Sequence, residues 1–179
     1  NVNIHWIEAE EIKKANVHEF LNDMDGILVP GGFGRRGTEG KMEAIRFARE
    51  QQIPYLGICL GMQLAIVEFC KNVVGIADAA SIELVPKTDN PVISLMPEQD
   101  GVEDIGGTLR LGAYPCELKS GSLAEKLYEK SNISERHRHR YEVNNDYRTC
   151  LEEKGMVLSG LSPDKRIVEM IELPSHPFF

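Results

Sequence analysis

The amino-terminal third of the chain alternates short β-type runs with helical patterns, and this alternation limits the fold more than any other feature. The β-type runs are Val2 to Ile7, Gly26 to Pro30 and Ile53 to Ile58. The helical patterns are a short helix at Val17 to Leu21, a helix with Met42, Ile45 and Ala48 on one face, and a helix that begins near Gly61. Because these runs are apolar enough to be covered on both faces, they predict an α/β fold whose central sheet is mostly parallel, with helices on both faces.

The second half of the sequence is less regular. The stretch "IGGTLRLGAYPCEL" predicts a strand pair with glycine turns, and Ser122 is a plausible N-cap for a helix that reaches Lys130. The stretch from Met156 to Leu173 predicts a hairpin that turns at Ser162-Pro163-Asp164. No internal repeat, linker or shift in composition divides the 179 residues, so we expect a single domain over residues 1–179.

Composition and charge exclude several classes of protein. The net charge of -8 argues against a nucleic-acid partner, and the basic run from Arg136 to Arg140 is too short to change this. No apolar run approaches the roughly 20 residues that cross a bilayer, and no signal peptide is visible, so we expect no membrane partner. Four cysteines without CxxC spacing fit reduced thiols in a cytoplasmic protein and predict no metal site.

The most informative local motif is Gly57-Ile58-Cys59-Leu60-Gly61, which lies between a predicted strand and a predicted helix. A Gly-x-nucleophile-x-Gly turn at this place holds its central residue in a strained conformation at a helix N-terminus, which favours thiolate over thiol. Cys59 is therefore a candidate nucleophile. The alternative is a small buried residue, because free cysteine is among the most buried residue types.

A second glycine-rich stretch, Val29 to Gly34, follows the strand before it. Consecutive glycines there let backbone N–H groups point into a cleft, where they can hold an oxyanion beside the nucleophile. The alternative is a tight loop with positive φ. The carboxyl ends of parallel strands meet at one edge of a sheet, so both turns are expected to border one crevice.

Four segments together resemble a known family. "VPGGFGRRGTEGKMEAIRFARE" and "PYLGICLGMQLAIVEF" are similar to class I glutamine amidotransferases. "IGGTLRLG" and "ERHRHRYEVNN" narrow the resemblance to the glutamine amidotransferase domain of the CTP synthases, over nearly the whole chain from about Asp25 to Phe179.

The resemblance implies an activity and its partners. A cysteine would attack the carboxamide of L-glutamine, form a glutamyl thioester and release ammonia. In the family this ammonia passes to a synthetase domain of the same polypeptide, which aminates UTP to CTP with ATP and magnesium, and GTP activates the coupling. The amidotransferase domain itself would need no cofactor, and the whole enzyme would be a cytoplasmic homotetramer.

The resemblance also implies residue roles. Cys59 would be the nucleophile, and Gly31, Gly32 and Leu60 would form the oxyanion hole. The residues implied to bind glutamine are Gly32, Phe33, Leu60, Gly61, Met62, Gln63, Glu83 and Arg140. This fits their chemistry, because Arg140 can clamp an α-carboxylate and Glu83 can accept from an α-ammonium group. From its position beside the glycine turn, the Arg35-Arg36-Gly37 loop is expected near an allosteric contact, where Arg36 would take part in GTP activation.

One expected part of the site is missing from the sequence. The family carries its catalytic histidine and glutamate in a Phe-His-Pro-Glu-Phe segment, whereas this chain ends in "SHPFF", which matches an earlier His-Pro of the family. We therefore do not assign His176 to catalysis, and we expect polar, structural or regulatory roles for His137 and His139. The chain is expected to be truncated at both ends and inactive alone. The alternative function is a degenerate glutamine-binding or scaffolding module without turnover.

Overall fold

The computed structural model describes residues 1–95 and 110–179. Its helices are α1 (Val17–Leu21), α2 (Thr38–Gln51), α3 (Leu60–Phe69), α4 (Leu123–Tyr128) and α5 (Arg148–Glu153), with a π-helical turn (Cys70–Val74) after α3 and a 3-10 turn (Asn145–Tyr147) before α5. Its strands are β1 (Ile27–Val29), β2 (Tyr55–Gly57), β3 (Ala80–Ser81), β4 (Pro91–Ser94), β5 (Arg110–Leu118), β6 (Asn132–His139), β7 (Glu142–Val143), β8 (Val157–Leu161) and β9 (Val168–Glu172).

The strands form small sheets of mixed direction. β1 and β2 pair in parallel, and β3 pairs in parallel with β4, which is antiparallel to β7. The sheet ordered β6-β5-β8-β9 is antiparallel throughout. The chain is thus an α/β protein as predicted. The mostly parallel central sheet is not confirmed, because the largest sheet of residues 1–95 and 110–179 is antiparallel.

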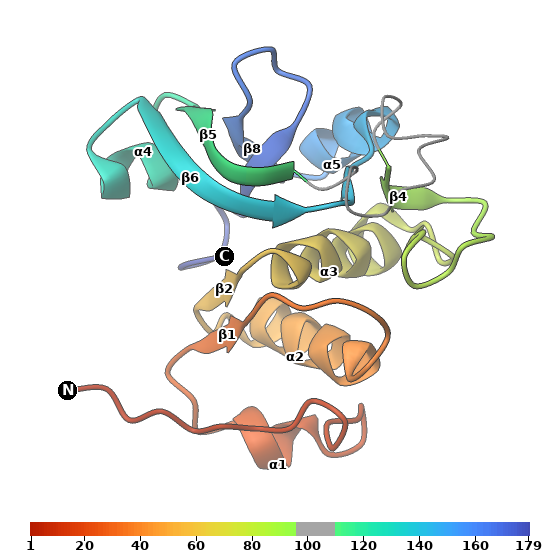
Figure 1. The fold of residues 1–179 in the computed structure, drawn as a ribbon. Coiled ribbons are helices and arrows are strands. Elements are labelled where there is room, and N and C mark those ends of the chain that lie inside the picture. Colours follow the sequence, from red (N-terminus) through yellow and green to blue (C-terminus); the bar gives the residue numbers. More distant parts are fainter. Residues whose placement is uncertain (96–109) are drawn as a thin grey trace.

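Helix α3 occupies the centre of the molecule. All ten of its residues are buried, and it lies between α2 and the sheet that contains β5 and β6 (Figure 1). A helix that is apolar on every side must be covered on every side, which explains this position. Its one charged residue, Glu68, is 1% exposed and accepts a hydrogen bond of 2.7 Å from Arg49 Nη2 of α2. Helix α3, which begins next to Cys59, is therefore covered on both sides.

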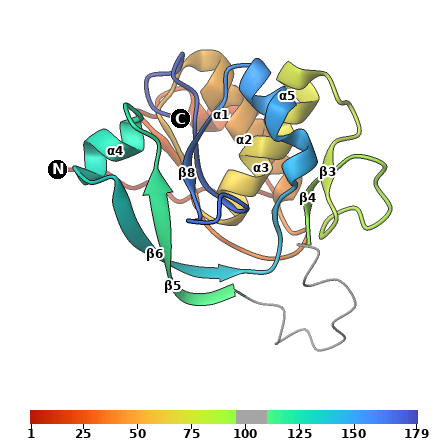
Figure 2. The ribbon, with the colours of Figure 1, turned by 90° about the horizontal axis from the view of Figure 1, so that it is seen from above.

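The antiparallel sheet supplies the second half of the site. Seen from above, β5 and β6 form a long curved pair beside the stacked helices α2 and α3 (Figure 2). Along β6 the side chains alternate between the solvent and the interior, and Ile133, Glu135, His137 and His139 are the half-buried ones. The inward face of β6 thus carries two histidines toward the interior.

Most elements predicted from the sequence are confirmed. Helix α1 has the predicted bounds, β1, β2 and α3 lie where they were expected, and β8 and β9 form the predicted hairpin. At α4, Ser122 Oγ accepts a hydrogen bond of 3.1 Å from the Glu125 N–H, as expected of an N-cap.

One predicted element is wrong. Val2 to Ile7 is not a strand, because no strand of the described residues pairs with it, and Val2, Ile4 and Trp6 are 87%, 70% and 90% exposed. Of the stretch "IGGTLRLGAYPCEL", in which a strand pair was expected, the described residues 110–118 form one strand, β5, which pairs with the later strand β6. Residues 105–109 of that stretch lie outside the described residues.

Candidate active site

Cys59 lies at the turn between β2 and α3 in a strained conformation, with φ 55° and ψ -106°. Both flanking glycines are required by close contacts. A Cβ at Gly57 would lie 2.7 Å from the Gly61 carbonyl carbon, and a Cβ at Gly61 would lie 2.2 Å from the Val29 carbonyl oxygen. The Tyr55 hydroxyl donates a hydrogen bond of 2.9 Å to the Gly61 carbonyl. The sharp turn predicted from the sequence is therefore present, and only glycine fits on either side.

Two backbone N–H groups point at the sulfur of Cys59. They belong to Gly32, in the loop after β1, and to Leu60, the first residue of α3. A Cβ on Gly31 would lie 3.3 Å from the Cys59 Cβ, so this loop approaches the cysteine closely. Such a pair of donors beside a nucleophile can stabilise negative charge on sulfur and on an oxyanion formed next to it. The N–H groups of Gly32 and Leu60 are thus placed where the predicted oxyanion hole needs donors, and the oxyanion-hole role of Gly31, Gly32 and Leu60 stays a prediction.

A histidine that was not assigned to catalysis from the sequence also lies at this site. The side chain of His139, the last residue of β6, lines the same cavity as Cys59 and lowers the pKa of the Cys59 thiol. Its Nδ1 lies 3.6 Å from Oε2 of Glu142, which is only 3% exposed. His139 thus lies between a cysteine and a buried carboxylate, which is the order of groups that activates a cysteine nucleophile.

The contact changes the protonation of both partners. Burial raises the pKa of the Cys59 thiol, but the hydrogen bond and charge of His139 and the N–H groups of Leu60 and Gly32 lower it by more, so the pKa lies below its ordinary value. Burial lowers the pKa of His139, whereas its interactions with Cys59 and Glu142 raise it to about 9. Each partner thus favours the charged form of the other.

The carboxylate behind His139 belongs to a buried ionic network around Arg110 of β5. Arg110 Nε donates to Glu142 Oε1 over 3.0 Å, and its Nη1 and Nη2 donate to the two oxygens of Glu169 over 2.7 and 3.0 Å. Arg110 Nη2 also lies 3.3 Å from Nδ1 of His137, whose Nε2 lies 3.3 Å from Glu169 Oε2. These side chains are at most 9% exposed. Sequence reasoning missed the network.

The sequence signal that could have placed His139 in the interior is the spacing of two residues between the histidines. In Arg136-His137-Arg138-His139-Arg140 the histidines alternate with arginines, and within a strand this alternation places both histidines on one face. The run was interpreted only as a basic segment, because both residue types are polar and neither marks the inner face.

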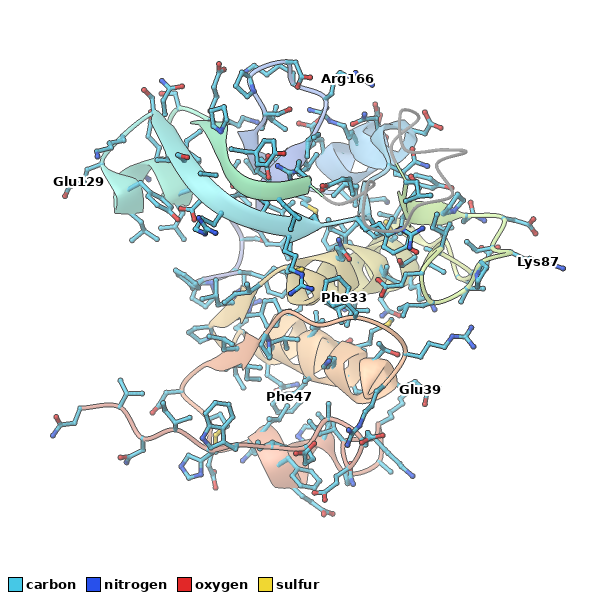
Figure 3. All side chains as sticks on the ribbon, viewed as in Figure 1. Phe33, Glu39, Phe47, Lys87, Glu129 and Arg166 are labelled. Atoms are coloured by element: carbon cyan, nitrogen blue, oxygen red, sulfur yellow. The ribbon has the colours of Figure 1, made fainter. Side chains whose placement is uncertain are left out.

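The predicted glutamine-binding residues occupy two places beside Cys59. Glu83 Oε1 accepts a hydrogen bond of 2.7 Å from the Gly34 N–H, so this carboxylate holds the loop that carries Gly31 and Gly32. Phe33 of the same loop is 56% exposed, and the Arg138 guanidinium lies 5.8 Å from the centre of its ring. Figure 3 shows Phe33 beside α3, on the loop between β1 and α2.

The other predicted binding residues come from α3 and from the segment after β6. Leu60, Gly61, Met62 and Gln63 are buried. Gln63 Nε2 donates a hydrogen bond of 2.8 Å to the Tyr141 carbonyl, which ties α3 to the segment that carries Arg140. The Nε of Arg140 is buried and finds no hydrogen-bond partner within residues 1–95 and 110–179. An unpaired guanidinium nitrogen can bind an anionic group, so the role of Arg140 toward the α-carboxylate stays a prediction.

A cavity of about 620 Å³ opens next to Cys59. Cys59, His139 and Met62 line it, together with apolar side chains that include Leu56, Ile58 and Met170. Gly32, Phe33, Glu83 and Arg140 do not line it. Because its wall is mainly apolar, this cavity is a poor place for the charged ends of glutamine.

His176 is engaged elsewhere. Its Nε2 lies 3.0 Å from the Ala48 carbonyl, and its Nδ1 accepts a hydrogen bond from the Phe178 N–H. In the part of the chain that the structure describes, no cluster of three His, Cys, Asp or Glu side chains is arranged to hold a metal ion, and no helix is long and apolar enough to cross a membrane. All four cysteines are free thiols.

Comparisons with known proteins agree with this geometry. The family described as "Glutamine amidotransferase class-I" matches residues 1–179. Two relatives named CTP synthase, from Staphylococcus saprophyticus and Halalkalibacterium halodurans, are 59% and 60% identical over all 179 residues. The chain spans about a third of the length of these relatives, 33% and 34%.

A solved structure shares the fold. The glutaminase domain of Trypanosoma brucei CTPS with bound acivicin superimposes with a TM-score of 0.94 at 36% sequence identity, over 100% of this chain and 70% of that one. Together with the family match over its whole length, this places the chain in the class I glutamine amidotransferase family.

Proposed function

We propose that this chain is the glutaminase part of a CTP synthase, which hydrolyses L-glutamine to supply ammonia for the amination of UTP to CTP. The observation that carries the proposal is the strained Cys59 between the N–H groups of Gly32 and Leu60, on a chain about 60% identical to proteins named CTP synthase. The lowered pKa of Cys59 does not suit a degenerate binding module, for which a protonated thiol would suffice.

The chemistry begins at sulfur. The Cys59 thiolate attacks the side-chain carbonyl carbon of glutamine, a C–S bond forms, and the carbonyl electron pair moves to oxygen, where N–H groups of Gly31, Gly32 and Leu60 can stabilise it. When the C–N bond breaks, the leaving nitrogen takes up the proton that the Cys59 thiol had lost and departs as ammonia, and a glutamyl thioester remains, which water hydrolyses to glutamate. Arg140 would bind the α-carboxylate, Glu83 the α-ammonium group, and Gln63 would hold the Arg140 segment in place.

The remaining parts of the proposal concern the complete protein. A synthetase domain of the same polypeptide would use ATP with magnesium to activate UTP and would receive the ammonia, with GTP as activator. We propose a cytoplasmic homotetramer as its assembly. We also propose that β1 and β2 belong to a larger parallel sheet in the complete domain. At the start of β2 the Tyr55 N–H already donates a hydrogen bond of 2.7 Å to the Phe178 carbonyl, near the end of the chain.

Acivicin, the compound bound in the trypanosomal domain, tests the glutaminase proposal. In the complete protein it is expected to modify Cys59 and to abolish release of ammonia from glutamine, and excess glutamine is expected to slow the modification. Peptide mass mapping reads out the site. Modification spread over Cys59, Cys70, Cys116 and Cys150, or no protection by glutamine, would contradict the proposal.

A further inference from the structure

A short link carries the chain from one sheet to another, and Arg140 is its first residue. His139 ends β6 of the antiparallel sheet, and Glu142 begins β7, which pairs with β4 in a different sheet. We call residues 139–142 the corner. Because so short a link has few conformations, the direction in which Arg140 leaves it depends on how the two ends of the corner are held.

Arg110 of β5 is tied to both ends of the corner. Its backbone is the register partner of His139, so it lies opposite the first end. Its side chain reaches the second end, where Nε donates a hydrogen bond of 3.0 Å to Glu142 Oε1. The side chains of Arg110 and Glu142 are 9% and 3% exposed, so little water competes for this contact. One residue thus sets the separation between the two ends.

The Arg110 guanidinium is itself fixed from its far side. Its Nη1 and Nη2 donate hydrogen bonds of 2.7 and 3.0 Å to the two oxygens of Glu169 on β9. A bidentate pair of this kind restricts both the position and the plane of the guanidinium. The hydrogen bond from Arg110 Nε therefore holds Glu142 at one place, which a flexible cation would not do.

A further contact holds the middle of the corner. Gln63 of α3 is 5% exposed, and its Nε2 donates a hydrogen bond of 2.8 Å to the Tyr141 carbonyl. Helix α3 begins directly after Cys59, so this hydrogen bond ties the corner to the helix that follows the nucleophile. The backbone of Arg140 thus lies between an end held by Arg110 and a peptide group held by α3.

Arg140 itself keeps an unused donor within this frame. Its guanidinium lies 5.5 Å from the centre of the Tyr141 ring, and its Nε is buried without a hydrogen-bond partner among the described residues. A guanidinium has only donors, so the missing partner is an acceptor, and a carboxylate matches its planar fork. The direction of the Arg140 backbone decides where such a carboxylate can bind.

We propose that Arg110 is a positioning residue for substrate recognition: by holding Glu142, it fixes the corner and orients Arg140 toward the α-carboxylate of glutamine. Arg110 acts through Glu142 and the backbone of the corner, and its own guanidinium is occupied by the two carboxylates. This role deepens the proposed function and rests on it.

The test is substrate selectivity in the complete protein. The compound γ-aminobutyramide is glutamine without its α-carboxylate, and Cys59 would attack the same side-chain amide in both, so a ratio of kcat/KM values cancels changes at the sulfur. The wild type is expected to prefer glutamine by about 100-fold, since the analogue leaves the arginine without its anion. In Glu142→Ala the preference is expected to fall to about tenfold, mainly through a higher KM for glutamine.

Glu169→Ala is the matched control. It also removes a buried carboxylate partner of Arg110, so it disturbs the same ionic network, but Glu169 belongs to β9 and not to the corner. Its preference for glutamine is expected to stay within about twofold of the wild type. If Glu142→Ala fails to fold by circular dichroism, Glu142→Gln decides the question. It keeps an acceptor for Arg110 Nε but loses the charge, and its preference is expected to fall about threefold.

Equal losses of kcat/KM for both substrates in Glu142→Ala would overturn the role of Arg110, because they would mean a general effect on the site and not one on the α-carboxylate. Equal falls in preference in Glu142→Ala and Glu169→Ala would overturn it too, as would an unchanged preference in Glu142→Gln where that variant decides. A wild type that releases no ammonia from glutamine would instead remove the proposed function, and this role with it.

Discussion

Replacing Arg110 with methionine removes the one guanidinium that faces Glu142 and Glu169. The methionine keeps most of the buried aliphatic volume, so the change falls mainly on charge. Three hydrogen bonds of 2.7 to 3.0 Å are lost, and two carboxylates, 3% and 2% exposed, are left without their partner. Removing one partner of a buried ion pair costs about 3–5 kcal/mol. With two carboxylates affected, we expect about 4 kcal/mol of lost unfolding free energy at pH 8.

The loss is expected to depend on pH in a definite direction. Arg110 is one of the groups that lower the pKa of His137, so its removal lets that pKa rise. A group whose folded pKa is raised contributes stability at low pH and loses it as the pH increases through the folded value. Protonated His137 can replace part of the missing charge at pH 5.5, and the destabilisation there is expected to be less than half of that at pH 8.

Urea unfolding followed by far-UV circular dichroism at both pH values measures the effect. Lys165→Met is a suitable control, because it removes a cation from an exposed pair with Glu117, with side chains 53% and 39% exposed, and is expected to change the unfolding free energy by less than about 0.5 kcal/mol. A loss below about 1 kcal/mol for Arg110→Met, or one that is equal at pH 8 and pH 5.5, would refute the reasoning.

Three further predictions concern the site. Gly61→Ala places a Cβ 2.2 Å from the Val29 carbonyl oxygen and should lower glutaminase kcat by about 100-fold or more. In the control Gly121→Ala the new Cβ meets nothing within 4 Å, so this change should only lower the unfolding free energy, by about 1 kcal/mol. Equal activities of the two variants in steady-state assays would contradict this prediction. Glu83→Gln keeps an acceptor for the Gly34 N–H but loses the charge, so the KM for glutamine should rise about tenfold with kcat little changed, and an unchanged KM would remove its ligand role. Arg36→Ala should weaken GTP activation of the complete enzyme without affecting folding, since Arg36 is 81% exposed and its ion pair is with exposed Glu10; activation curves that superimpose would exclude it.

The elements that could be predicted from the sequence are those whose cause is local. Helix α1, the turn at Cys59 and the Ser122 cap each depend on residues within one or two turns of the chain, and each is found where it was predicted. The glycines of the turn were informative because no other residue fits at those contacts.

What the sequence could not reveal depends on pairing over long distances. The β-type pattern of Val2 to Ile7 was present, but a strand needs a neighbour, and the described residues offer none. The pairing of β5 with β6 determines that His139 faces inward, and residues 132–139 by themselves do not show which face is buried. The meeting of His139 with Cys59 across 80 positions was therefore hidden, although the histidine spacing was visible.

Gln63 joins two layers of the molecule, since its amide reaches from α3 to the Tyr141 carbonyl just beyond β6. Cys59 belongs to the first layer and His139 to the second, so the charge on sulfur depends on how far apart the layers stand. At an effective dielectric constant of about 20, moving two unit charges from about 4 Å to about 5 Å weakens their attraction by about 0.8 kcal/mol, or roughly fourfold in the thiolate equilibrium. Any partner that shifts one layer relative to the other would thus change the reactivity of Cys59 without contacting its sulfur.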